Sequence, residues 1–428
     1  MPVNLGYPYF GHTGVRNRIE IAGGGLVGGT LAADAFTDGV HIEMCNGAHS
    51  TDNTFLITDG GNVLVREVRF AGGGRRNVFT VEDGVLECAL VTYSGGGDNV
   101  FRIGKDGYVE IRKGNYGVLF QGTGDLFEIR GGKMKDPYGY ILTQGSGNVF
   151  RITEGGSYEL TGNSVAMQGN GGGNLIDVED GELHCTLIAC TGNGEMLRVG
   201  ANGYLKTTYY VDWYIRGSDN LFEIRGGRAD FHLGYMNIGY QTTLHTGNKF
   251  RVSDGGLVDA KAPFYLYGSG NMAEIVGTNP VDGTPSELDM TGYNFELGDS
   301  VYFATYPDFV DNSLRTGGGG LVKCKDLIVQ SGNGLAPVVC AESDTRQAGT
   351  GCVYVSGTAT FKSGTYVKPS AEKDAPAGKY KILEAGTLDD FDNIELIPPD
   401  APGAWALIPD GDSIWLRYSH PMTIMIVR

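Results

Sequence analysis

The sequence predicts an all-β fold, a right-handed parallel β-helix with about 24 residues and three strands per coil. Three observations support this prediction: a repeated motif, a two-residue alternation of apolar side chains within it, and glycine-rich corners after the strands. A clear copy of the motif is NVFRITEGGSYEL, residues 148–160. A fixed period of this size is typical of a solenoid, and parallel crossovers are right-handed in nearly all proteins.

Each copy begins at an anchor residue, usually Asn, followed by apolar, Phe-like, charged and Ile or Val residues and a Gly-centred turn. Successive anchors are 36, 24, 22, 26, 23, 26, 21, 25, 28 and 23 residues apart. Asn amides stacked at one corner are expected to form a hydrogen-bonded ladder that caps corner carbonyls. The anchors are Asn17, Asn53, Asn77, Asn99, Asp125, Asn148, Asn174, Glu195, Asn220, Asn248 and Asn271.

The alternation within each copy indicates strands, because side chains along a strand point to opposite faces in turn. In NVFRI the Phe and Ile positions should face the interior and the residue between them the solvent. A second short strand follows the Gly turn, and a third ends at glycines such as Gly122, Gly145 and Gly169. Sharp corners favour Gly and Asn, which tolerate positive φ.

The predicted domain organisation has three parts. Residues 1–280 form regular coils, residues 281–320 form irregular coils or an excursion because the anchor disappears near Pro280, and residues 321–428 form the final coils and a C-terminal β cap. Turn-forming Pro-Asp and Asp-Gly pairs between segments of alternating apolar residues indicate hairpins in the cap. A solenoid needs such a cap because its last apolar layer would otherwise be an open edge.

The residue three positions after the anchor is charged in eight successive copies, and the sign of its charge alternates from copy to copy. We call this predicted column of side chains the charge ladder. In register, each charge would lie about 4.8 Å from opposite charges in the neighbouring coils. Exposed pairs contribute only about 0–1 kcal/mol each, so the expected role of this ladder is to specify register. Its members are Arg102, Glu128, Arg151, Asp177, Arg198, Glu223, Arg251 and Glu274.

The cysteines fall into two groups. Cys88 and Cys185 both lie 11 residues after their anchors, at the strand position that another copy fills with Leu160, and should therefore be buried. Cys340 and Cys352 are near enough in sequence to pair across a short loop. The seven cysteines cannot all form disulfides within one chain, because their number is odd.

The composition excludes several partners and cofactors. A net charge of −17 argues against nucleic acid and anionic membranes as partners. The sequence has no apolar run of about 20 residues, so membrane insertion is not predicted. The first residues carry no secretory signal. The seven histidines are scattered and no CxxC motif occurs, so neither a metal site nor a cofactor site is predicted.

Many β-helices are polysaccharide lyases or hydrolases, which use clustered carboxylates on an outer face. The adjacent pair Asp389 and Asp390 falls in the cap region, and His184 occupies an outward slot that other copies fill with charged residues. No catalytic residue is assigned. A carbohydrate-active enzyme remains the alternative.

An aromatic cluster is a possible sugar-stacking site, because tyrosine and tryptophan rings bury an apolar face while their polar tips stay wet. The alternative is that about half of these rings fill the core. Tyr235, Tyr240, Tyr265 and Tyr267 follow in the next layers. The cluster itself consists of Tyr209, Tyr210, Trp213 and Tyr214.

The C-terminal pattern GKYKIL (378–383), WAL (405–407) and GDSIWL (411–416) resembles the cap of bacterial autotransporter passengers, and the repeats resemble their β-helices. This resemblance implies a secreted or cell-surface structural or adhesin-like module without catalysis. Its partners would be a surface glycan or another surface protein. No outer-membrane barrel follows residue 428 in this sequence, so the resemblance does not extend to self-secretion.

Overall fold

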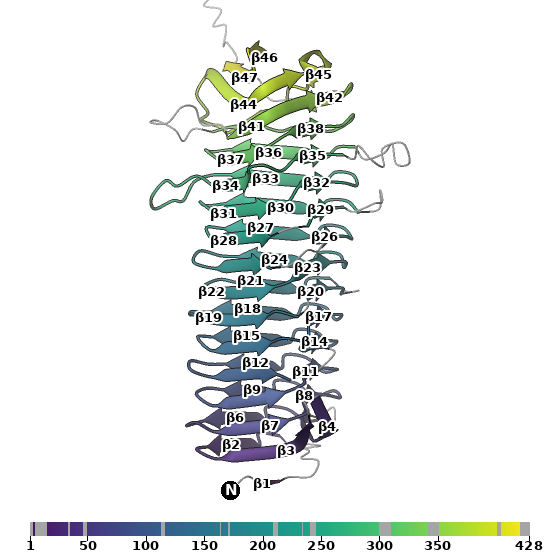
Figure 1. The fold of residues 1–428 in the computed structure, drawn as a ribbon, viewed down its shortest axis with the longest axis vertical. Helices are drawn as coiled ribbons and strands as arrows, with labels where there is room; N and C mark the ends of the chain where they lie inside the picture. The colour runs from purple at the N-terminus through teal and green to yellow at the C-terminus, as the bar shows by residue number, and fades with distance from the viewer. Residues whose placement is uncertain are drawn as a thin grey trace, which may run out of the picture. The chain divides into compact units, whose positions relative to one another are not determined.

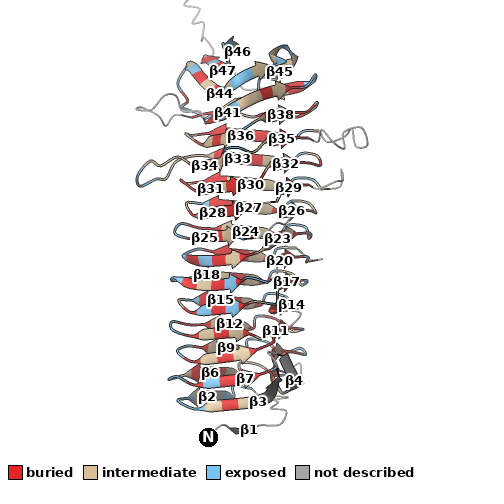
Figure 2. Cartoon of the chain, in the orientation of Figure 1, coloured by how far each residue is buried: buried red, intermediate tan, exposed pale blue. Residues whose placement is uncertain are grey.

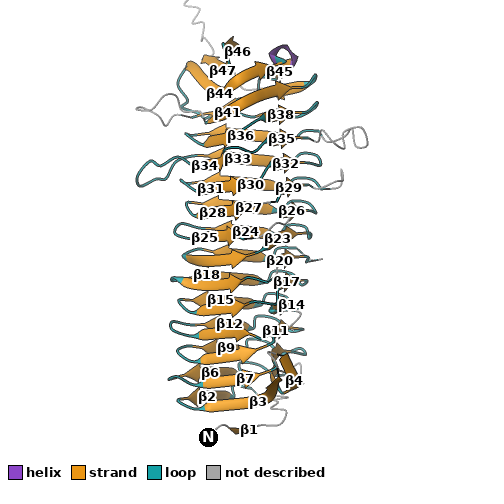
Figure 3. Cartoon of the chain, viewed as in Figure 1, coloured by secondary structure: helices purple, strands orange, loops and turns teal. Residues whose placement is uncertain are grey.

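The computed structural model describes residues 3–4, 15–32, 35–45, 49–112, 116–162, 164–169, 172–208, 213–232, 234–239, 245–298, 310–340, 351–399 and 404–419. These residues form an all-β solenoid of three parallel sheets, which confirms the predicted fold class (Figures 1 and 3). The coils average about 26 residues, against the predicted period near 24. No described helix is long and apolar enough to cross a membrane. The chain divides into two units, Met1–Val211 and Asp212–Arg428, which are described separately.

In the first unit each coil contributes one strand to each sheet, and successive coils pair in parallel register. The first sheet contains β2 (Arg18–Ala22), β6 (Thr54–Thr58), β9 (Val78–Val81), β12 (Val100–Ile103), β15 (Leu126–Arg130), β18 (Val149–Thr153), β21 (Leu175–Val178) and β24 (Met196–Val199). The second contains β1 (Val3–Asn4), β3 (Gly25–Ala32), β7 (Asn62–Val65), β10 (Val85–Cys88), β13 (Tyr108–Ile111), β16 (Lys133–Asp136), β19 (Gly156–Leu160), β22 (Gly181–Cys185) and β25 (Tyr204–Thr207). The third contains β5 (His41–Cys45), β8 (Glu67–Phe70), β11 (Leu90–Tyr93), β14 (Val118–Phe120), β17 (Ile141–Thr143), β20 (Ser164–Met167) and β23 (Leu187–Cys190).

The second unit continues the same three-strand pattern. Its first sheet contains β27 (Leu221–Arg225), β30 (Lys249–Ser253), β33 (Met272–Val276), β36 (Ser313–Gly317), β39 (Gly334–Leu335), β40 (Val338–Val339), β42 (Thr365–Val367), β43 (Ser370–Ala371) and β45 (Ile394–Leu396). The second contains β28 (Arg228–His232), β31 (Leu257–Lys261), β34 (Glu287–Met290) and β37 (Leu321–Cys324). The third contains β26 (Trp213–Ile215), β29 (Met236–Ile238), β32 (Phe264–Leu266), β35 (Phe295–Leu297) and β38 (Leu327–Val329).

The C-terminal strands depart from this pattern. The long strand β41 (Cys352–Phe361) pairs with both β37 and β38, so one strand serves the second and third sheets. It pairs in turn with β44 (Gly378–Asp389). Antiparallel pairing of β44 with β47 (Ser413–Ser419), and of β47 with β46 (Ala404–Asp410), gives the expected hairpin-like end. A 3-10 helix, η1 (Phe391–Asn393), precedes β45.

The core follows the predicted alternation, which is visible along strands such as β15 and β18 (Figure 2). The Phe position of the motif forms a stack in which ring centroids of successive coils lie 4.7–5.1 Å apart. These spacings match the distance between hydrogen-bonded strands. The stacked rings are Phe55, Phe79, Phe101, Phe127 and Phe150.

Cys88 and Cys185 are fully buried free thiols, as predicted. The suggested pairing of Cys340 with Cys352 is wrong: both are buried and neither forms a disulfide. The Cys340 thiol lies 3.7 Å from the Val338 carbonyl, and the Cys352 thiol lies 3.8 Å from the Val353 carbonyl. Each sulfur therefore has a backbone acceptor within its own chain segment.

Each coil corner has a left-handed residue immediately before the anchor. Asp98 has φ 59° before Asn99, and Gly147 has φ 64° before Asn148. This conformation turns the chain into the first strand while placing the anchor side chain at the corner. Asp and Gly are among the residues that adopt it most readily.

Two insertions lengthen the chain between anchors. Strand β4 (Ala35–Gly39) pairs antiparallel with β3 and adds a hairpin between Asn17 and Asn53. Between β33 and β34 a hairpin loop is closed by the Thr278–Pro285 bridge. Both insertions leave the parallel register on either side intact.

Candidate functional site

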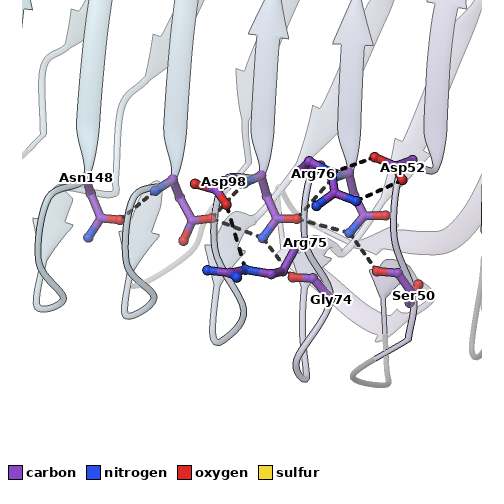
Figure 4. A network of polar contacts seen from close by, with 10 residues as sticks. Ser50, Asp52, Gly74, Arg75, Arg76, Asp98 and Asn148 are labelled. Atoms are coloured by element: carbon purple, nitrogen blue, oxygen red, sulfur yellow. Dashed lines mark hydrogen bonds and ion pairs between the residues drawn. The ribbon is translucent and has the colours of Figure 1, made fainter.

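The anchor residues of the first unit form a continuous hydrogen-bonded column at one corner, as predicted (Figure 4). The Asn77 carbonyl Oδ1 accepts from the Asn53 backbone N–H at 3.1 Å and from Asn53 Nδ2 at 2.9 Å. Asn77 Nδ2 donates to Asn99 Oδ1 at 3.0 Å and to the Ser50 carbonyl at 3.2 Å. The column therefore joins neighbouring coils and also satisfies corner carbonyls.

The second unit has an equivalent column that continues beyond the point where the sequence motif fades. The backbone N–H groups of Asn248, Asn271 and Asn312 donate to the side-chain oxygens of Asn271, Asn312 and Asn333 at 2.8–3.0 Å. The predicted loss of the anchor near Pro280 is therefore wrong. A 41-residue step and the polar Ser313 after the anchor hid Asn312 from the motif.

The charge-ladder residues of the first unit lie on the outer face of the first sheet, one per coil. Arg102 Nε lies 2.7 Å from Glu128 Oε2. Asp177 lies between two arginines: Arg151 Nε is 3.2 Å from Asp177 Oδ2, and an Arg198 guanidinium nitrogen is 2.9 Å from the same oxygen. The Asp177 side chain is only 2% exposed, so it is the least solvated charge in this part of the ladder.

In the second unit Glu223, Arg251 and Glu274 lie in register on successive strands. Arg251 forms ion pairs with both carboxylates, at 3.5 Å and 3.3 Å. Arg315, three residues after the missed anchor Asn312, lies 3.4 Å from Glu274. The three-residue offset that defines the charge ladder, applied to Asn312, identifies Arg315 as its next member.

A second polar cluster, which the sequence did not indicate, lies on the third sheet of the first unit around Glu67. Glu67 is 5% exposed and accepts hydrogen bonds from His41 Nδ1 at 2.7 Å, Thr92 Oγ1 at 2.7 Å, and Arg69 at 2.7 and 3.0 Å. Burial raises the pKa of Glu67, but the bonds from His41, Arg69 and Thr92 outweigh it and lower the pKa to about 2. An ionised carboxylate so fully bonded is suited to joining coils, and poorly suited to moving a proton.

The other residues considered from sequence are dispersed. His184 lies 3.4 Å from Glu182 on the outer face of β22. Asp389 ends β44 and Asp390 precedes η1. Across the described parts of the chain, no group of three or more His, Cys, Asp or Glu residues is arranged to hold a metal ion.

The aromatic candidates are only partly described. Tyr209 and Tyr210 lie outside the described residues, and Trp213 and Tyr214 are described through their backbone in β26.

The neighbouring tyrosines of the second unit form a described group. Tyr235 is 51% exposed, and its ring centroid lies 5.9 Å from that of Tyr265, which stacks on Tyr267 at 5.4 Å. Asn237 and Glu296 pair with Tyr265 from the strands on its two sides.

The fold and its polar columns define a parallel β-helix repeat protein. The sequence matches no protein-family model and no curated protein. Among solved structures it is similar to the TibC-catalysed hyper-glycosylated fragment TibA55-350, with 13% identity over 78% of this chain and 96% of that chain and a TM-score of 0.23. At that identity and TM-score the likeness carries no conclusion about what this chain binds or does.

Proposed function

We propose that this chain is a non-catalytic structural or adhesive module of a secreted or cell-surface protein. The observation that supports this proposal is the use of acidic side chains on the strands. Asp177 and Glu274 are each paired with arginines of neighbouring coils, and Glu67 is bonded to His41 of the preceding coil. A general acid or base needs a pKa near the working pH, which a carboxylate held by several hydrogen bonds and ion pairs does not have. Here these acidic groups hold coils together.

The test is a screen of the purified chain against acidic and neutral polysaccharides, with uronide and reducing-end release as the readout. We expect no release above a heat-denatured sample. Turnover that scales with protein concentration would overturn the proposal, and it would support the carbohydrate-active alternative.

A second candidate function is glycan binding at the Tyr235 group, defined as Tyr235, Asn237, Tyr265, Tyr267 and Glu296. Exposed aromatic rings offer a face to the apolar side of a sugar. Tyr235 is 51% exposed, while Asn237 and Glu296 on the strands beside Tyr265 are buried. The carboxylate and the net charge of −17 favour an uncharged oligosaccharide over an anionic one.

Replacing Tyr235 by Ala should weaken binding of a neutral oligosaccharide about tenfold, equivalent to roughly 1.4 kcal/mol, because one stacking face is lost. Binding would be measured by calorimetry on glycans chosen from an array. Tyr354→Ala is the matched control, since Tyr354 is 40% exposed on another part of the second unit. Equal affinities of the wild type and Tyr235→Ala for the glycan would exclude the Tyr235 group as its binding site.

A further inference from the structure

In most steps of the anchor column an amide supplies both an acceptor and a donor. Asn99 illustrates the pattern: its Oδ1 accepts from Asn77, while its Nδ2 donates to Asp125 Oδ1 at 3.0 Å and contacts the Gly74 carbonyl at 3.4 Å. The acceptor faces the preceding coil. The amide hydrogens satisfy the next anchor and a corner carbonyl.

Asp125 brings a carboxyl group into this column. Its Oδ1 accepts from the Asn99 backbone N–H and from Asn99 Nδ2, both at 3.0 Å. Its Oδ2 lies where the other members carry the amide nitrogen: a Cβ at Gly122 would overlap Asp125 Oδ2, as a Cβ at Gly145 would overlap Asn148 Nδ2. An oxygen therefore occupies a donor position.

The surroundings of this oxygen disfavour a negative charge. Asp125 is 0% exposed, and its Oδ2 has no hydrogen-bond partner among the described residues. Asn99 and Asn148 adjoin it in the column, and the Tyr93 hydroxyl is committed to the Leu126 carbonyl at 2.9 Å. The charged group acting on Asp125 is the like-charged Asp98, which lies 3.7 Å from Arg75.

We propose that the folded protein holds Asp125 as a neutral carboxylic acid, with the proton on Oδ2 replacing an amide hydrogen of Asn, so that this coil junction binds a proton and releases it on unfolding. The O–H group supplies the donor that the column requires at this level. The stack is then pH-sensitive at this coil.

The expected titration has a definite direction. Burial is the largest effect and raises the pKa of Asp125 from 3.8 to about 6, although hydrogen bonds from Asn99 oppose the rise. Because the folded pKa lies above the unfolded one, the stabilisation is complete below about pH 4 and is lost as the pH rises through about 6. Glu195, which accepts from Asn174 Nδ2 at 3.1 Å, has its pKa raised by burial to about 7 and acts in the same direction between about pH 4.5 and 7.

The experiment compares the full chain with Asp125→Asn in urea unfolding from pH 4 to 8 and measures proton release on unfolding at pH 5. The wild-type midpoint should fall as the pH rises, and the variant should show a shallower fall and release about one proton fewer. At pH 5, where exposed carboxyls are ionised, folded Asp125→Asn should also lack one protonated-carboxyl band in the infrared spectrum. Asn is the usual anchor residue, so this variant is expected to fold.

Asn77→Asp places a carboxyl group at a column position that is not adjacent to Asp125, and it should add a second copy of the same pH dependence. Asp52→Asn removes a half-buried carboxylate paired with Arg76 at the same corner and should leave proton release at pH 5 within error of the wild type. Identical proton release by the wild type and Asp125→Asn would overturn the proposal. A lower midpoint for Asp125→Asn at pH 8 would also overturn it.

Discussion

Single residues determine whether a corner can form. Gly147 has φ 64°, and a Cβ added there would meet nothing closer than the Gly124 backbone nitrogen at 4.0 Å. Gly145, two residues earlier, lies so close to the preceding coil that a Cβ would overlap the Gly122 carbonyl. One glycine is needed for its backbone conformation and the other for space.

Replacing Gly147 by Ala should lower the free energy of unfolding by about 1–2 kcal/mol, the cost of placing an L-residue in the left-handed region. Replacing Gly145 by Ala should cost more, because a backbone carbonyl in the neighbouring coil must move. Urea titration of both variants at one pH gives the comparison. A larger loss for Gly147→Ala than for Gly145→Ala would contradict the assigned roles.

At the scale of the strand, ion pairs on the outer face of the first sheet join β18, β21 and β24 through one buried carboxylate. Asp177 receives Arg198 Nε at 3.0 Å on Oδ1, and both Arg198 and Arg151 on Oδ2. We propose that such junctions specify register. A shift of one residue would place the buried Asp177 opposite an apolar side chain.

Replacing Asp177 by Asn should lower the free energy of unfolding by about 1.5–3 kcal/mol, because hydrogen bonds to a charged and buried group are lost. The matched control is Glu154→Gln, whose carboxylate pairs with Arg130 at 2.8 Å but is 58% exposed; its loss should stay below about 1 kcal/mol. Denaturant midpoints at low and high salt test the difference. Equal losses for the two variants would show that burial of Asp177 adds nothing.

At the scale of the whole molecule, we expect coils to be interchangeable if the corner geometry and the charge alternation are kept. Deleting residues 125–173 removes two coils and joins Gly124 to Asn174. Gly124 and Gly173 both have positive φ, at 70° and 75°, so the new junction keeps a left-handed residue before an anchor. Arg102 then faces Asp177, and opposite charges still meet.

The two-coil deletion should fold with a strand-type circular dichroism spectrum and a cooperative transition, since each coil contacts only its neighbours. Deleting residues 148–160 removes half a coil and should abolish the cooperative transition, because the following strands lose their partners. A cooperative transition in the half-coil variant would contradict the coil as the unit of folding.

Sequence reasoning found the strands, the inward positions and the anchor column, because each depends on local alternation repeated at a nearly constant period. It missed Asn312 and Asn333 where an insertion lengthened one step. It also missed the Glu67 cluster, since His41, Glu67 and Thr92 meet only when three particular coils stack. The turn residues between the C-terminal strands pointed to terminal hairpins, but β41, which pairs with two sheets, has no local sequence signature.

The anchor column also has a direction. Between successive anchors the donor N–H belongs to the earlier coil and the acceptor oxygen to the later one, as from Asn53 to Asn77 and from Asn248 to Asn271. An incomplete stack therefore ends in donors on its C-terminal side, and the next coil must bring an oxygen, which Asn, Asp125 and Glu195 all do. Two copies meeting through their C-terminal sides would place donors against donors. The direction of these hydrogen bonds therefore favours stacking of the next coil of the same chain over stacking of a second copy by its equivalent end.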